Sequence, residues 1–195
     1  WIRLCWPCKR RNRINLEDIF REKKAEALLI TDPYNMRYIS GFRGGEGMLF
    51  LTRDRRALIT DSRYTEAASQ ETDFEVIEEN RGHRRTAILR ELFSETGAAA
   101  GYEDQSLRCS EFAVLRNALP EVKHWIPLGG SADCLRRIKT PEELEYLRRA
   151  EAIGDEAFQA LLPLLKPGMT ELEAAELEYQ MKKRGAEGFS FDTFS

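Results

Sequence analysis

The feature that most constrains this chain is an alternation of strand-like and helical patterns along most of its length. Leu16, Ile19 and Phe20 have helical spacing, and the apolar run Ala27–Thr31 has the length of a buried strand. The remaining pattern predicts strands at 48–52, 57–60, 74–78, 98–102 and 122–126, and helices at 63–71, 84–96 and 110–119. Alternating strands and helices predict a layered α/β domain over residues 14–133.

Two segments rich in turn-forming residues follow the first predicted strand. Asp32-Pro33-Tyr34-Asn35 is predicted to be a turn, because a residue that precedes proline avoids the helical region of backbone space. Gly41–Gly47 is a glycine-rich connection that leads into a strand. A phosphate-binding loop leads into a helix instead, so these glycines do not predict one.

Residues 134–195 follow a different pattern, with long helices instead of short alternating elements. Thr140-Pro141-Glu142-Glu143 combines an N-cap, a proline in the first turn and a glutamate three residues after the cap. An amphipathic helix is therefore predicted up to Leu165, and a second one from Thr170 to about Arg184. A final strand is predicted at 189–195, and we expect these elements to begin a second, incomplete domain.

Composition excludes several classes of protein. Apolar residues make up 42% and charged residues 32%, with a formal net charge of −3, which is typical of a soluble globular chain without a nucleic-acid partner. The basic run at 9–13 lies in an N-terminal segment, residues 1–13, that we interpret as irregular and solvated. No apolar run approaches the ~20 residues that span a bilayer, so we expect no membrane partner and a cytoplasmic location. The four cysteines are expected to be reduced thiols.

Five motifs in one order carry a family resemblance. The segments 35–42 (NMRYISGF) and 60–64 (TDSRY) resemble conserved segments of the creatinase/prolidase N-terminal domain and of Xaa-Pro peptidases. The segments 135–143 (LRRIKTPEE), 167–171 (PGMTE) and 185–193 (GAEGFSFDT) continue the resemblance at the spacing of that family. The match runs from about residue 16 to the end of the chain.

The resemblance implies an architecture and a chemistry. It implies a three-layer α/β creatinase/prolidase N-terminal domain, followed by the first two helices and first strand of an α+β pita-bread domain. Such proteins are proline-specific metallopeptidases, aminopeptidases or dipeptidases, that hydrolyse Xaa-Pro bonds of proline-containing peptides. Two divalent metal ions, which we expect to be manganese, are held by two Asp, one His and two Glu. The resemblance places these ligands after Ser195, so we assign no catalytic or metal residue here and expect no metal on this stretch alone.

The resemblance also implies a homodimer in which the N-terminal domain controls access to the active site. Its candidate substrate-entrance or intersubunit residues are those of the first two motifs, namely Asn35, Arg37, Asp61, Arg63 and Tyr64. Read without the family, Tyr38, Ile39 and Phe42 of the first motif are interpreted as core residues, and Asp61 with Arg63 as a local ion pair. Of the two histidines, His83 is interpreted as solvated in a loop and His124 as partly buried on a strand.

Two alternative functions remain open at this point. The architecture also occurs in non-catalytic binding modules that have lost the metal ligands. A creatinase-like amidinohydrolase shares the same fold. The presence or absence of the Asp, His and Glu ligands in the adjoining sequence separates an enzyme from a binding module.

Overall fold

The computed structural model describes residues 15–174 and 176–188. The chain divides into two compact units between Ile138 and Lys139, and each unit is described by itself. The predicted N-terminal segment 1–13 and the predicted final strand at 189–195 lie outside the described residues. The domain boundary predicted after residue 133 stays a prediction.

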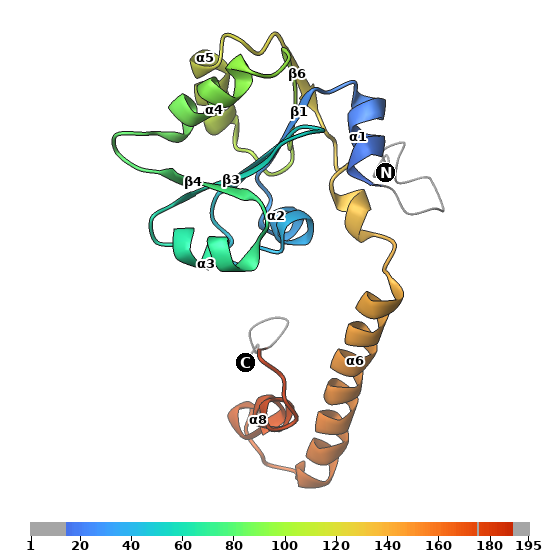
Figure 1. The fold of residues 1–195 in the computed structure, drawn as a ribbon. Helices are drawn as coiled ribbons and strands as arrows, with labels where there is room; N and C mark the ends of the chain where they lie inside the picture. Colours follow the sequence, from blue (N-terminus) through green and yellow to red (C-terminus); the bar gives the residue numbers. More distant parts are fainter. Residues whose placement is uncertain (1–14, 175, 189–195) are drawn as a thin grey trace. The chain divides into compact units, whose positions relative to one another are not determined.

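The first unit is built on a β-sheet (Figure 1). The sheet has six strands in the order β4-β3-β2-β1-β5-β6. β2 runs antiparallel to both of its neighbours, and every other pair is parallel. The carboxyl ends of β1, β3, β4 and β5 therefore lie along one edge of the sheet. The strands are β1 (Ala27–Ile30), β2 (Met48–Leu51), β3 (Arg56–Asp61), β4 (Glu75–Glu79), β5 (Ala99–Tyr102) and β6 (His124–Pro127).

Helices cover both faces of this sheet and make three layers (Figure 1). One face packs against α1 (Leu16–Lys23), α2 (Pro33–Ser40), α3 (Thr65–Glu71) and the 3-10 helix η2 (Asp133–Arg136). The other face packs against α4 (Arg85–Ser94) and α5 (Cys109–Ala118).

Alternation along each central strand supplies the two halves of the core. In β1, Leu28 and Ile30 belong to the cluster on the α1/α2 face, whereas Ala27 and Leu29 belong to the cluster on the α4/α5 face. Because both faces are covered, all four residues of β1 are buried, and the strand reads as a continuous apolar run. The three-layer α/β fold that the sequence predicts is confirmed.

The turn predicted at Asp32–Asn35 is wrong, because these residues begin the helix α2. The Asp32 carboxylate accepts hydrogen bonds from the backbone N–H groups of Tyr34 and Asn35, each at 3.0 Å. Asp32 itself has extended backbone angles, as a residue before proline prefers, and Pro33 occupies the first helical position. The same residues that suggested a turn therefore cap a helix, which Gly41 ends at a φ of 82°.

The second unit contains α6 (Pro141–Leu161), the 3-10 turn η3 (Leu162–Leu164), α7 (Glu171–Ala174) and α8 (Glu176–Lys183). The predicted capping box is present, since Thr140 Oγ1 accepts from the Glu143 N–H at 3.1 Å and the Glu143 carboxylate accepts from the Thr140 N–H at 2.6 Å. The α-helix ends four residues before the predicted Leu165, because Pro163 lies in the following 3-10 turn and has no N–H to continue the helical hydrogen bonds. No described helix of either unit has the length and apolar character needed to cross a bilayer.

Candidate functional site

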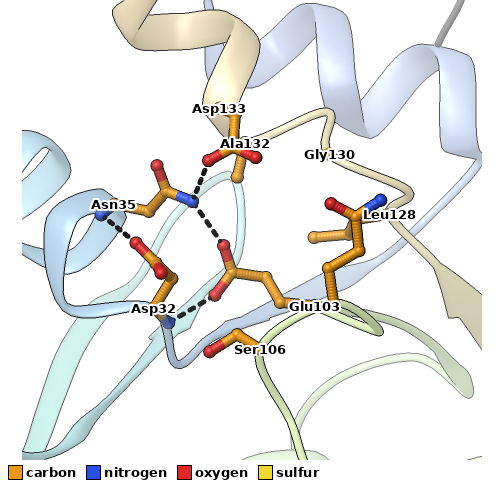
Figure 2. A pocket seen from close by; sticks show the side chains of 9 residues that line it. Asp32, Asn35, Glu103, Ser106, Leu128, Gly130, Ala132 and Asp133 are labelled. Atoms are coloured by element: carbon orange, nitrogen blue, oxygen red, sulfur yellow. Dashed lines mark hydrogen bonds between the residues drawn. The ribbon is translucent and has the colours of Figure 1, made fainter. Parts of the chain in front are cut away.

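A polar cavity of about 210 Å³ opens at the carboxyl edge of the sheet, beside the start of α2 (Figure 2). The ends of β1 and β5, the first turn of α2 and the segment that leads into η2 meet there. Its polar lining consists of Asp32, Asn35, Glu103, Gln105, Ser106 and Asp133, and its other walls are Leu128, Gly130 and Ala132.

Glu103 is the most deeply buried of the charged groups in this lining, with 6% of its surface exposed. Glu103 follows β5 directly, and because β5 pairs with β1, its carboxylate lies beside the carboxyl end of β1. One carboxylate oxygen, Oε2, accepts hydrogen bonds from the backbone N–H groups of Thr31 at 2.6 Å and Asp32 at 2.7 Å. The other, Oε1, accepts from Asn35 Nδ2 at 2.7 Å.

The Asn35 side chain connects Glu103 to η2. Its Nδ2 donates a second hydrogen bond to Asp133 Oδ1 at 3.0 Å, and its Oδ1 accepts from Arg136 Nε at 2.7 Å. Arg136 also donates to Asp133 Oδ1 at 2.8 Å. Asn35 is 3% exposed, so this candidate entrance residue lies inside the fold as the centre of a hydrogen-bond network.

Burial dominates the electrostatics of Glu103. Loss of hydration raises the pKa of the Glu103 carboxyl above its ordinary value of 4.5, and the negative charge of Asp32 raises it further. The hydrogen bonds from Asp32, Thr31 and Asn35 favour the ionised form and lower the pKa in part. Both Glu103 oxygens are occupied by donors, so this arrangement fixes the backbone instead of presenting a free acid or base to a substrate.

The candidates Asp61, Arg63 and Tyr64 form a second group at the end of β3. Arg63 donates from Nε to Asp61 Oδ1 at 3.1 Å, and from Nη2 to Asp61 Oδ2 at 2.6 Å and to Glu46 Oε2 at 2.7 Å. Its guanidinium lies over the Tyr64 ring at 5.1 Å, and the Arg63 hydrogen bonds lower the pKa of the Asp61 carboxyl. Because Arg63 is exposed, these ion pairs contribute little to stability.

The structure therefore places four of the five candidates in two separate networks, and Arg37 belongs to neither of them. Asn35 belongs to the buried cavity, and Asp61, Arg63 and Tyr64 belong to the exposed end of β3. Arg37 lies on the exposed side of α2, and its guanidinium has no ion-pair partner in the described part of the chain. Among the five candidates, Arg37 and Arg63 are the exposed charged residues.

The remaining metal-ligand residue types are dispersed. His83 lies 3.3 Å from Glu91 Oε1, and His124 is exposed on the edge strand β6, so the prediction of a partly buried His124 is wrong. Among the described residues, no group of three or more His, Cys, Asp or Glu side chains is placed to hold a metal ion.

The cysteines only partly match the expectation of reduced thiols. Cys109 is a free, exposed thiol, whereas Cys134 is disulfide-bonded, which contradicts the prediction at that position. Cys5 and Cys8 lie outside the described residues.

Sequence reasoning missed Glu103 as the acceptor at the centre of this site. One signal was available, because a glutamate that directly follows a buried parallel strand lies at the edge where the carboxyl ends of strands meet. Its partners could not be read from the sequence, since Asn35 and Glu103 are 68 positions apart and Asn35 and Arg136 are 101 apart.

Curated proteins of similar sequence are peptidases. The chain is 36% identical over 180 residues to an uncharacterized peptidase, YqhT, from Bacillus subtilis, which covers 91% of this chain and 50% of that protein. It is 30% identical to an Xaa-Pro dipeptidase from Pyrococcus furiosus, over 88% of this chain and 48% of that protein. The chain thus spans about half the length of the curated relatives that it matches.

Solved structures show the same relationship. An Xaa-Pro dipeptidase from Bacillus anthracis superposes with a TM-score of 0.82 at 31% identity, and an X-Pro aminopeptidase from Thermotoga maritima with 0.77 at 33%. These comparisons cover 91% and 90% of this chain, and 50% and 51% of the respective structures. The N-terminal domain of cytoplasmic peptidase PepQ from Mycobacterium tuberculosis matches 62% of this chain and 95% of its own, with a TM-score of 0.53 at 28% identity.

Two family models match consecutive parts of the sequence. Residues 145–195 match metallopeptidase family M24, and residues 13–138 match the creatinase/prolidase N-terminal domain. The second of these matches covers more than half of the chain and coincides with the three-layer unit described above. The chain therefore belongs to the creatinase/prolidase N-terminal domain family.

Proposed function

We propose that this chain is the N-terminal part of a proline-specific metallopeptidase that hydrolyses Xaa-Pro bonds. The observation that carries the proposal is the consecutive match of an N-terminal domain of this family and of metallopeptidase family M24 in one chain. Relatives described as Xaa-Pro dipeptidase and X-Pro aminopeptidase support proline-containing peptides as the substrate class. The whole protein, and not the described residues alone, would carry out the reaction.

In this proposal the first unit serves dimerisation and access to the active site. Arg37 is the strongest candidate for contact with a substrate carboxylate, because it is exposed and has no ionic partner among the described residues. Asp61, Arg63 and Tyr64 are candidates for a contact between subunits, whereas Asn35 would act by holding α2 in place. In the assembled enzyme, Arg37→Ala is expected to lower kcat/KM, and an unchanged kcat/KM would remove Arg37 from this role.

The metal centre of the proposed enzyme does not come from the described residues. Their carboxylates are dispersed or already bonded to amides and guanidinium groups, so they do not fit a dinuclear centre. We propose two divalent ions, manganese in particular, held by other residues of the whole protein. Such ions, when bound, would supply the activated water that peptide hydrolysis needs.

The proposed location is the cytoplasm, without nucleic-acid or membrane partners. The net charge of −3 and the similarity to a peptidase described as cytoplasmic support it. The disulfide at Cys134 weighs against it, because disulfides are rare in a reducing compartment. Alkylation of thiols in intact cells, followed by mass spectrometry of the peptide that contains Cys134, tests this point: a cytoplasmic protein should be labelled there.

The experiment that tests the activity uses the longest reading frame that encodes these residues. The purified protein is loaded with Mn²⁺ and assayed on Ala-Pro, on Ala-Pro-Ala and on Ala-Ala-Ala as the matched control. We expect cleavage only before proline, and loss of activity with a chelator. Preference for the dipeptide or the tripeptide separates a dipeptidase from an aminopeptidase.

Three other outcomes would contradict the proposal. Equal cleavage of Ala-Ala-Ala would remove the proline specificity. Hydrolysis of creatine without cleavage of peptides would point to an amidinohydrolase. A reading frame without the Asp, His and Glu ligands, and without turnover of any substrate, would point to a binding module.

A further inference from the structure

Glu103 is held by donors from two different segments. The backbone N–H groups of Thr31 and Asp32 come from the end of β1, and Asn35 Nδ2 comes from the first turn of α2. All three bonds are 2.7 Å or shorter, which is typical of hydrogen bonds to an ionised carboxylate. The geometry therefore suits the ionised form of Glu103.

Asn35 transmits this contact to η2 (Figure 2). Its amide nitrogen is shared between Glu103 and Asp133, and its carbonyl oxygen is held by Arg136. η2 spans Asp133–Arg136 and lies next to the boundary between the two units at Ile138. The position of Asn35 thus decides how α2 and η2 are joined.

The charged groups that face Glu103 come from both of these elements. Asp32 is the N-cap of α2, and Asp133 and Arg136 lie on η2. Asp104 follows Glu103 but turns away, since its Oδ1 accepts from the Gly129 N–H at 2.7 Å. Burial raises the pKa of Glu103 above 4.5, so this carboxyl takes up a proton at a higher pH than an exposed glutamate does.

We propose that Glu103 is a pH-sensitive latch, which in its ionised form ties β1 and α2 to η2 through Asn35. A proton on either Glu103 oxygen turns that oxygen into a donor that faces another donor. A proton on Oε1 displaces the Asn35 amide, and a proton on Oε2 displaces the N–H groups of Thr31 and Asp32. Protonation of Oε1 therefore removes one of the three hydrogen bonds that position the Asn35 side chain, and the amide is then held less firmly against Asp133 and Arg136 of η2. This inference does not depend on the proposed peptidase activity.

Linkage fixes the sign of the accompanying stability change. The pKa of Glu103 is higher in the folded chain than in the unfolded one, so the folded chain binds the proton more tightly. The contribution of Glu103 to the unfolding free energy is therefore fully present below pH 4.5 and is lost as the pH rises through the folded-state pKa. The ionised carboxylate of Glu103 is a buried charge. The unfolding free energy is therefore lower at higher pH, where the latch is closed, than at low pH, where Glu103 is protonated.

NMR of the 195-residue chain tests the latch without any variant. We expect the chemical shifts of the Thr31 and Asp32 amide protons to change with pH together with the chemical shift of the Glu103 carboxyl carbon. The midpoint of these changes should lie above pH 4.5. Over the same range, hydrogen exchange at the Leu135 N–H in η2 should accelerate beyond its intrinsic pH dependence as the pH falls. A Leu135 exchange rate that does not follow the Glu103 titration would overturn the proposal, as would the absence of a titration above 4.5.

Two variants sharpen the test. Glu103→Gln should abolish both pH dependences, because the amide does not titrate. Asp104→Asn is the matched control, since it neutralises the adjacent carboxylate, which also accepts from a backbone N–H but does not touch α2. It should retain the titration of Thr31 and Asp32. If Asp104→Asn removed it and Glu103→Gln did not, the latch would be assigned to the wrong residue.

Discussion

Asn35 is buried, and both the nitrogen and the oxygen of its side-chain amide form hydrogen bonds, so a substitution of this residue tests the network directly. Replacing it by alanine leaves Glu103, Asp133 and Arg136 each without one partner. We expect Asn35→Ala to lower the unfolding free energy by about 1–3 kcal/mol, measured by urea denaturation, because a buried group that loses its partner keeps its desolvation cost. Arg37→Ala is the control on the same helix; it is exposed and should change stability by less than about 0.5 kcal/mol. Equal effects would contradict the network.

Gly47 supplies a second residue-scale prediction. It has a φ of 145° before β2, and a Cβ placed there would lie 2.7 Å from the Ile59 carbonyl oxygen of β3. Gly45 also has a positive φ, of 75°, but a Cβ there would meet nothing within 4 Å. Gly45→Ala should cost about 1 kcal/mol from backbone conformation alone, and Gly47→Ala should cost clearly more. Thermal unfolding of both variants measures the difference, and a smaller loss for Gly47→Ala would refute the close approach to β3.

At the scale of elements, the central strands were predicted well because both of their faces are buried. The start of α2 and the end of α6 were predicted less well, because capping residues and prolines decide where a helix begins and ends. β1 and β2 are continuous apolar runs, so their positions follow from the sequence within a residue. α2 was predicted as a turn because Asp-Pro suits both a turn and a helix start, and only the bonds from Tyr34 and Asn35 to Asp32 decide between them. The apolar spacing past Leu161 suggested a longer α6, but Pro163 has no N–H and ends it.

The N-cap of α6 gives a prediction at this scale. Thr140→Ala removes the hydroxyl that accepts from Glu143, and should weaken the first turn by about 1 kcal/mol. Hydrogen exchange should then accelerate at the N–H of Glu143, whereas the middle of α6 should be unaffected. Thr140→Ser keeps the hydroxyl and should behave like the parent chain. Loss of the whole helix in Thr140→Ala would show that α6 depends on its cap rather than on its packing.

At the scale of the whole molecule, the sequence predicts the three-layer α/β class of the first unit, because short strands alternate with helices along it. It does not predict the Asn35–Glu103–Arg136 network, since such contacts follow from the order of strands in the sheet and from where η2 returns to it. The exposed members of the candidate set are likewise placed by the fold: Arg37 and Arg63 face solvent, but nothing in their local sequence distinguishes them from Asn35, which is buried.

The two units differ in the core that each one encloses. The first has an apolar cluster on each face of its sheet, whereas the buried apolar residues described in the second are Ala157 and Leu161. On α6, Leu147 and Phe158 are 52% and 48% exposed. Since stability depends on the area that a core removes from water, the two clusters of the first unit favour its folding by itself, and the described residues of the second unit form no comparable cluster.

We therefore expect residues 1–138, expressed alone, to unfold cooperatively at nearly the same urea concentration as the first unit does within the longer chain. Residues 139–195 expressed alone should show little protection from hydrogen exchange. A matched pair of variants tells the contributions of the two units apart. Leu28→Ala in β1 should shift the unfolding transition of residues 1–138 within the full chain, because it leaves a cavity in the core. Leu147→Ala on α6 should leave that transition unchanged. If residues 1–138 failed to fold, or if Leu147→Ala shifted that transition, the first unit would depend on the second for its stability.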